Sequence, residues 1–350
     1  MPRAAIKMEE NQAIECGRLT ASLFVIFIHI LFPGDLGQIM DCLSRFAVPF
    51  FFMVSGVFAC WVGEETLLKR GLRIFRLEMT ASLIYFLWGC YRERFFYRNS
   101  LWLFLKGTFS ERKIAQWIFL NENPIAGHLW YLSAAAVCFG ILWLYVRMSG
   151  EKTVRYTPLY IVGVCLYGFQ IAFGTYAAAI GQEVWNTFYR NGLFFGLPMF
   201  LLGIFLREYQ QRIKAAFRLT NGKLIVIILV CALLNILQWR GFGRTEMPLA
   251  TLPETIALML LLWWNPRVSG NQTLKKIISK FGRLSLCVYI LHPLLYQLYL
   301  CYGQRHILAY FPQAEGYMQP LMIGAVSLGM GVLYELFLYF VGWMKAKTAV

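Results

Sequence analysis

The chain has 350 residues, of which 59% are hydrophobic and only 15% are charged. A soluble domain carries about a quarter charged residues, so this composition excludes an ordinary soluble protein. The apolar segments are continuous rather than alternating, which favours membrane helices over a transmembrane barrel. The net charge of +15 follows how Lys and Arg are distributed among the loops and does not indicate nucleic-acid binding.

Ten apolar runs predict an all-α polytopic membrane protein with about ten transmembrane helices. The runs fall at 14–32, 46–62, 77–91, 129–146, 158–180, 191–206, 224–239, 249–264, 284–302 and 319–344. With the amino terminus inside, 21 Lys and Arg lie on cytoplasmic segments and 11 on outer ones, which predicts both termini in the cytoplasm. We expect residues 1–350 to form one integral membrane domain, without a separate soluble domain. The nine cysteines lack pairing or metal-ligand spacing, so we expect neither a disulfide framework nor a metal site.

The first run holds two ionisable residues, Arg18 and His29, and begins with Glu15-Cys-Gly-Arg18. Eleven residues at about 100° each place both side chains on one helix face, roughly 16 Å apart. Ionisable groups inside a membrane helix usually face a bundle interior or a water-filled cavity, which indicates a functional site. The alternative is an arginine that snorkels at the cytoplasmic edge and a histidine at the opposite interface.

The second run begins with Arg45-Phe-Ala-Val-Pro49-Phe-Phe-Phe-Met-Val-Ser55-Gly56. Ser55 is a candidate for a hydroxyl in a tunnel wall. Small residues such as Ser55 and Gly56 also allow close helix packing, and packing is the reading that these two residues favour by themselves.

At the start of the third run, Lys69, Arg73 and Arg76 stand at i, i+4 and i+7 and form one basic stripe. Arginines at such a place suit phosphate groups, because they stay charged and bond in a fork. Ordinary anchoring of the helix at the cytoplasmic face is the alternative, and without further information it is the preferred one.

The longest connection, residues 92–128, holds two short aromatic pieces, Leu101 to Leu105 and Ile114 to Leu120. We predict that they form short interfacial or re-entrant helices between the third and fourth spans, at the outer face. An extra pair of spans is the competing interpretation, but neither piece is long enough to cross a bilayer.

Two further motifs lie in the fourth and ninth runs. The fourth run opens with His128-Leu-Trp130-Tyr131-Leu, where an aromatic belt is expected. The ninth contains Phe281-Gly-Arg-Leu-Ser285-Leu-Cys-Val-Tyr289-Ile-Leu-His292-Pro293. His292 either faces the same cavity as the first run or lies at the membrane interface. Two acidic residues also fall within or near runs: Glu78 and Glu335. Either can pair with an internal arginine, and the sequence names no partner.

In this order and across ten runs, the four motifs resemble the acyltransferase 3 family of membrane-bound O-acyltransferases, over about residues 12 to 340. Such proteins are multi-pass proteins of the cell membrane that move acyl groups, usually acetyl from cytoplasmic acetyl-CoA, onto hydroxyls of extracytoplasmic glycans or related acceptors. The resemblance therefore implies acyl-CoA as co-substrate, no metal, and a glycan or lipid-linked sugar as acceptor. Without an appended extracytoplasmic domain, the chain either transfers the acyl group directly or hands it to a separate transferase partner.

The resemblance also implies roles for individual residues. His29 becomes the general base that takes the acceptor's hydroxyl proton, and Arg18 shapes the site or meets the carrier. The basic stripe becomes a binding site for the CoA phosphates. The family often has Arg-Ile-Leu-Pro at this place, whereas this chain has Arg73-Ile-Phe-Arg76. The substrate tunnel is expected to be lined by Arg45, Ser55, Trp130, Tyr131, Tyr289 and His292.

The chain is also similar to the membrane domain of vancomycin-resistance serine racemases, which is associated with serine uptake. A transporter or binding domain for a small carboxylate such as serine is therefore the alternative function. The presence of both Arg18 and His29 favours the enzyme, although the same pair suits a carboxylate substrate.

Overall fold

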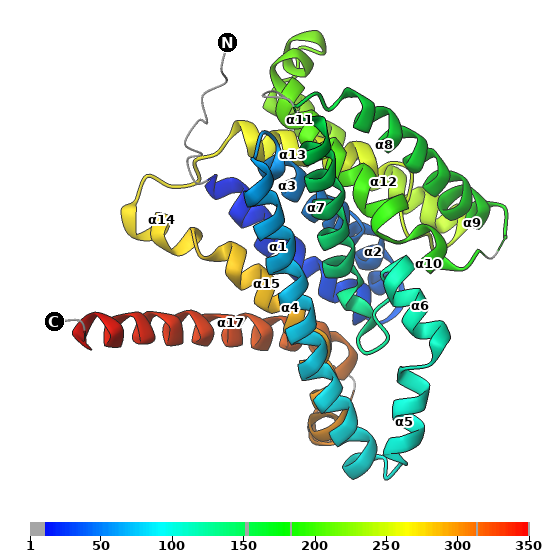
Figure 1. The fold of residues 1–350 in the computed structure, drawn as a ribbon. Coiled ribbons are helices and arrows are strands. Elements are labelled where there is room, and N and C mark those ends of the chain that lie inside the picture. Colours follow the sequence, from blue (N-terminus) through cyan, green and yellow to red (C-terminus); the bar gives the residue numbers. More distant parts are fainter. Residues whose placement is uncertain (1–10, 151–153, 183, 313, 349–350) are drawn as a thin grey trace. The chain divides into compact units, whose positions relative to one another are not determined.

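The computed structural model describes residues 11–150, 154–182, 184–312 and 314–348, and every regular element among them is a helix (Figure 1). The chain divides into two compact units. The terminal unit comprises Met1–Ala47 and Leu261–Val350, and the central unit comprises Val48–Leu260. The prediction of an all-α protein is confirmed for the described residues.

The terminal unit is built around α1, α15 and α17. Its helices are α1 (Gln12–His29), α2 (Gly34–Ser44), α14 (Gln272–Ile278), α15 (Phe281–Leu298), the π-helix η5 (Tyr299–Gly303), α16 (Gln304–Tyr310) and α17 (Glu315–Thr348). Helix α1 begins where the side chain of Asn11 accepts the backbone N–H of Ile14, which satisfies one free donor of the first turn. Ile26, Val288 and Ile323 form a buried apolar core that joins the three helices.

Helices α1 and α15 pack side by side and run parallel. The Ser285 hydroxyl donates to the Arg18 carbonyl, and further along both helices His29 lies beside His292. Helix α1 corresponds to the first predicted span and α15 to the ninth. Odd-numbered spans all cross the membrane in the same direction, so the parallel packing of these two helices is compatible with the predicted order.

The central unit contains most of the apolar helices. Its elements are α3 (Ala47–Ala59), α4 (Glu64–Tyr91), η1 (Arg92–Phe96), α5 (Leu101–Thr108), α6 (Glu111–Leu120), η2 (Gly127–Leu129), α7 (Trp130–Ser149), α8 (Thr157–Gln170), η3 (Ile171–Tyr176), α9 (Ala177–Ala179), α10 (Asn186–Tyr189), η4 (Gly192–Gly196), α11 (Leu197–Ala216), α12 (Asn221–Phe242) and α13 (Thr251–Trp264). Helix α4 packs along α7, and α8 packs along α11. Helices α3 and α13 each cross a boundary between the two units.

Glycines let α3 and α11 approach closely within the central unit. A Cβ on Gly56 would overlap the Phe200 carbonyl, and a Cβ on Gly203 would overlap the Met53 carbonyl. Each helix therefore presents a glycine to the backbone of the other, as in small-residue packing between membrane helices. Gly56 has the packing role that the sequence favoured.

Within the described residues, seven helical segments are long and apolar enough to cross a membrane. They are Gly34–Ala59, Gly127–Ser149, Thr157–Tyr176, Gly192–Ala216, Asn221–Phe242, Gln272–Tyr310 and Glu315–Gly342. The other three predicted runs fall on α1, which carries Glu15, Arg18 and His29, on α4, whose first half is charged, and on α13, which has only 14 residues. The chain is a multi-pass membrane protein, and ten spans with cytoplasmic termini stay a prediction.

The two aromatic pieces of the 92–128 connection are helical. They form α5, of 8 residues, and α6, of 10 residues, and both are too short to span a bilayer. Their position at the outer face stays a prediction. A loop follows α6, in which the Asn123 side-chain oxygen accepts the backbone N–H groups of Ile125 and Ala126 and fixes the turn into α7.

Candidate functional site

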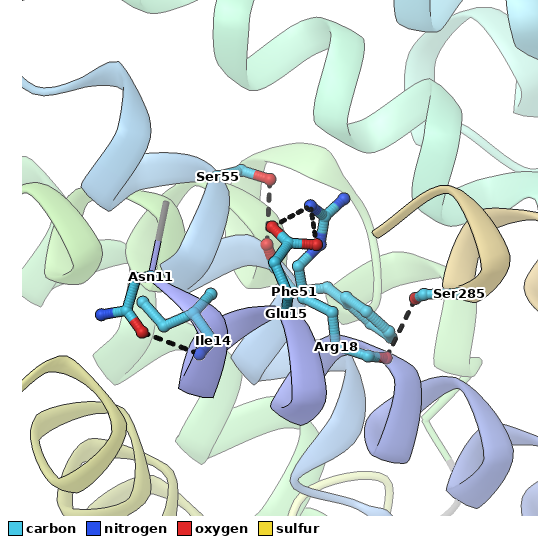
Figure 2. A network of polar contacts seen from close by, with 7 residues as sticks. All are labelled: Asn11, Ile14, Glu15, Arg18, Phe51, Ser55 and Ser285. Carbon is cyan, nitrogen blue, oxygen red and sulfur yellow. Dashed lines mark hydrogen bonds and ion pairs between the residues drawn. The ribbon is translucent and has the colours of Figure 1, made fainter. Parts of the chain in front are cut away.

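The amino-terminal end of α1 carries a charged pair against α15. Arg18 Nη1 lies 3.1 Å from Glu15 Oε1, one turn earlier on the same helix (Figure 2). The two side chains are 33% and 18% exposed, so the pair is partly open rather than sealed in the core. A guanidinium held by one carboxylate on one side keeps further N–H donors for an anionic ligand.

Two residues of α15 hold this pair in place. Ser285 Oγ donates to the Arg18 carbonyl at 2.9 Å (Figure 2). A Cβ built on Gly282 would overlap the Glu15 carboxylate and the Arg18 guanidinium. The α15 backbone therefore forms one wall of the pair, and only a glycine leaves room for both side chains as they lie. We call Glu15, Arg18, Gly282 and Ser285 the arginine end.

The other end of the same two helices carries imidazoles. The ring centroids of His29 and His292 are 5.3 Å apart with planes inclined by 38°, and the ring of Tyr289 lies 6.4 Å from that of His292. His292 is fully buried and Tyr289 nearly so, whereas His29 is exposed. We call these three residues the histidine end.

The structure places His29 as the last residue of α1, followed by Ile30 in an extended conformation. The first apolar run extends to residue 32, so the helix ends earlier than the apolar pattern. His29 thus lies at a helix end, and it is exposed. Arg18 and His29 share a face as predicted, but three helical turns, roughly 16 Å, separate them.

Arg45 lies between α2 and α3 and is buried. Its Nη2 atom lies 2.7 Å from Asp41 Oδ1, and the two side chains are 4% and 3% exposed. Removing one partner of a buried ion pair strongly destabilises the folded protein, because the other charge is left buried and uncompensated. This contact favours a structural role for Arg45 over a place in a tunnel wall.

The central unit holds the remaining residues expected to line a tunnel. Ser55 Oγ donates to the Phe51 carbonyl of its own helix at 2.9 Å. Trp130 is buried, and its ring lies 5.9 Å from that of Phe195 and is covered by Arg190 at 5.3 Å. Tyr131 meets Phe52 edge to face. These aromatic residues form a packed cluster at the start of α7.

The basic stripe lies on the first half of α4 and is exposed along its length. Lys69 Nζ approaches Glu65 Oε2 at 3.4 Å in a fully surface-exposed pair, and such pairs contribute little to stability. Arg70, beside the stripe, instead donates to the Phe58 carbonyl, and burial lowers the pKa of its guanidinium. Lys69, Arg73 and Arg76 are all exposed on this face, and Lys69 is the member with a nearby carboxylate.

Glu78 and Glu335, the two acidic residues noted in the sequence, have different partners. Glu335 of α17 binds Arg283 of α15, with Nη2 at 2.8 Å from Oε2, and lies 3.7 Å from Lys280 Nζ. Arg283 is thus the arginine partner that the sequence could not name. Glu78 Oε1 instead accepts from uncharged donors on Trp117, Asn123 and Ser133.

Glu78 joins three parts of the central unit. Its donors come from α6, from the loop after α6 and from α7, while Glu78 itself is on α4 and is 1% exposed. The sequence could not name these donors, because they lie 39 to 55 residues further along the chain. By contrast, the spacing of Glu15 and Arg18 is a standard helical ion-pair spacing, and that signal was available in the sequence.

Comparison with known proteins identifies a family whose sequence pattern covers these residues. The family model described as Acyltransferase domain, of the acyltransferase 3 type, matches residues 11–344. That range includes both ends of the α1–α15 pair and the basic stripe. No solved structure matches the chain.

The curated relatives carry a different name. The chain is 26% identical over 309 residues to an amino-acid racemase of Enterococcus faecalis, covering 80% of this chain and 40% of the relative. It is 26% identical over 325 residues to a serine/alanine racemase of Enterococcus gallinarum, covering 81% of this chain and 40% of the relative. The chain thus spans about two fifths of the length of these relatives.

Proposed function

This chain belongs to the acyltransferase 3 family, and we propose that it moves an acyl group, in the first instance acetyl, from cytoplasmic acyl-CoA to a hydroxyl of an extracytoplasmic glycan or related cell-envelope acceptor. The observation that carries the proposal is the parallel pairing of α1 and α15. It puts a partly open arginine at one end and an accessible histidine at the other, on the same two helices.

The chemistry divides between these ends. The acceptor oxygen attacks the thioester carbonyl carbon while His29 takes the hydroxyl proton. The C–S bond then breaks, and the sulfur leaves as a thiol after receiving that proton. General-base help of this kind is typically worth about 10²–10⁴-fold in rate. Arg18 lies three turns away, so we assign it to the anionic carrier or its extended arm rather than to the reacting atoms.

The basic stripe on α4 is proposed to hold the CoA phosphates. Its support is the exposure of Arg73 and Arg76 and the permanent charge of their guanidiniums. Lys69 shares its charge with Glu65 and is expected to contribute less.

The membrane arrangement belongs to the same proposal. Ten spans with cytoplasmic termini in the plasma membrane would put the arginine end and the stripe toward the cytoplasm and the histidine end toward the outer face. Tyr289 and His292 would line the acceptor's path at the histidine end. Trp130 and Tyr131, in the central unit, stay predicted tunnel residues. The single-domain prediction is retained as part of this proposal.

A second candidate is uptake or binding of a small carboxylate such as serine, favoured by the names of the curated relatives. Arg18 is the group in the α1–α15 pair that would meet a carboxylate. Its contact with Glu15 leaves further N–H donors for either anion, so this contact does not separate the two candidates.

The deciding experiment uses purified protein in lipid nanodiscs with labelled acetyl-CoA. We expect loss of the thioester and transfer of the label to a candidate glycan, and neither with His29→Ala. Parallel proteoliposomes measure labelled serine uptake. Serine uptake without thioester loss would replace the acyltransferase proposal with the transporter.

A further inference from the structure

The histidine end contains two imidazoles where the reaction above uses one. His29 and His292 come from helices more than 250 residues apart in sequence, and their rings lie 5.3 Å apart within the terminal unit. His29 is exposed, whereas His292 has no exposed surface. A substrate can therefore reach one ring and not the other.

The backbone defines which nitrogen of His292 carries the proton. His292 Nδ1 lies 3.0 Å from the carbonyl oxygen of Val288, one turn earlier on α15. A carbonyl oxygen only accepts hydrogen bonds, so Nδ1 must be the donor and carry its hydrogen. In the neutral ring, Nε2 then holds the lone pair. His292 offers an acceptor at the end of the ring away from its own helix backbone.

We propose that His292 is a positioning residue for His29. Its Nε2 atom accepts an N–H of the His29 ring, either directly after a small rotation or through one bridging water. That hydrogen bond fixes the tautomer of His29, so that the opposite nitrogen keeps the lone pair that takes the acceptor's hydroxyl proton. It also stabilises the imidazolium formed at that moment, and His292 gains no net proton over the cycle. This inference rests on the proposed acyl transfer.

The charged groups on the packed elements have other contacts. Asp41 on α2 pairs with Arg45, and Glu335 on α17 pairs with Arg283. Glu315 at the start of α17 accepts from Tyr299 at 2.9 Å. Asp35 of α2 is exposed, and the Glu15–Arg18 pair lies three turns from His29. Lys280, directly before α15, lies 3.7 Å from Glu335, and Arg305 of α16 is exposed. Tyr289 is the titratable group with a ring contact to His292.

The test compares two amide substitutions that differ only in reach. In His292→Gln the side-chain oxygen can occupy the position of Nε2 and still accept from His29. In His292→Asn the amide can replace the Nδ1 contact with Val288 but does not extend to the Nε2 position. We expect His292→Asn to lower kcat about 10- to 100-fold, as for other partners that orient a functional histidine, while His292→Gln keeps most of kcat. The apparent KM for acetyl-CoA should stay unchanged in both.

Two further readouts separate positioning from a structural role. Without the acceptor at residue 292 the imidazolium form of His29 is less stabilised, so the acid limb of the pH–rate profile should move to lower pH in His292→Asn. The double variant His29→Ala, His292→Asn should be no slower than His29→Ala alone, because residues that act as a unit are not additive. His306→Asn, an exposed histidine in the same unit, is the matched control and should leave rate and profile unchanged.

Equal loss in His292→Gln and His292→Asn with an unmoved pH profile would overturn the inference, as would additive losses in the double variant. A measurement independent of activity is ¹⁵N NMR of the histidine rings. We expect the Nδ1–H tautomer for His292, and an Nε2–H tautomer would also overturn it. Absence of acyl transfer by the unmodified protein would instead reject the proposed function, so the two failures are distinguishable.

Discussion

The arginine end and the histidine end lie on the same pair of helices but are built from different interactions. At the arginine end a charged pair is partly exposed, touches the α15 backbone at Gly282, and is held by a hydroxyl at the Arg18 carbonyl. At the histidine end two imidazole rings meet, one of them fully buried. The first arrangement suits an anion that is bound and released, and the second suits the movement of a proton.

This difference explains why one helix face carries both residue types three turns apart. A charged carrier needs donors that remain near water, since a fully buried charge is costly unless it is paired. A general base needs a defined tautomer and a neutral ring at rest, and the proposed contact with His292 would define that tautomer. The predictions below test whether the two ends have separate effects on kcat and KM, from the largest effect to the smallest.

The largest effect is expected at the histidine end. His29→Ala should lower turnover by about two to four orders of magnitude while leaving folding and acyl-CoA binding nearly intact. His29→Asn keeps hydrogen bonding without basicity and should be almost as impaired. The measurement is single-turnover acyl transfer in nanodiscs, with His306→Ala as control. Wild-type turnover in folded His29→Ala would show that the histidine end does not carry the chemical step.

At the arginine end, loss of binding should exceed loss of chemistry. Arg18→Ala removes charge-assisted hydrogen bonds and should lower kcat/KM about 10- to 100-fold, mainly through KM. Gly282→Ala should act in the same direction and less strongly, because its methyl group displaces the Arg18 and Glu15 side chains while the helix itself tolerates alanine.

The matched control for Gly282→Ala is Gly329→Ala on α17, where a Cβ meets nothing within 4 Å. Steady-state kinetics with varied acetyl-CoA separate the two variants. If Gly282→Ala and Gly329→Ala give the same KM for acetyl-CoA, the close approach of the α15 backbone at Gly282 does not affect binding of the carrier.

A smaller effect on KM is expected from the stripe on α4. The double variant Arg73→Ala, Arg76→Ala should raise the apparent KM for acyl-CoA about three- to tenfold, because exposed charge contacts are individually weak. Lys275→Ala, Lys276→Ala on α14 removes two exposed charges from another segment with the same predicted cytoplasmic position. An unchanged KM in the α4 variant would assign the stripe to anchoring at the membrane surface.

The smallest effect concerns the hydroxyl that ties α15 to α1. Ser285→Ala should cost about 0.6 kcal/mol of stability, the average for hydrogen bonds between membrane helices, with little change in turnover. The comparison is Ser327→Ala on α17, a buried hydroxyl for which the described residues offer no hydrogen-bond partner. Unfolding in mixed detergent measures both. If Ser327→Ala destabilises the protein more than Ser285→Ala does, the hydrogen bond from Ser285 to the Arg18 carbonyl does not stabilise the packing of α1 and α15.

The sequence by itself determined the class of protein, most of the membrane helices and the motifs that point to the family. Continuous apolar runs and the charge difference between loops are properties of the chain in one dimension, so they can be read without a fold. The same holds for the common face of Arg18 and His29 and for the helical spacing of the basic stripe, which follow from 3.6 residues per turn.

Only the tertiary structure decided which faces meet. The contacts of Glu78 with Trp117, Asn123 and Ser133, and of Gly282 with the Arg18 side chain, join residues far apart in sequence. The meeting of His29 with His292 depends on the register between α1 and α15, and a shift of one turn would separate the rings. The register depends on how Ile26, Val288 and Ile323 pack in the shared core. Many apolar residues of similar hydropathy lie along these helices, so the apolar pattern alone does not show which of them meet.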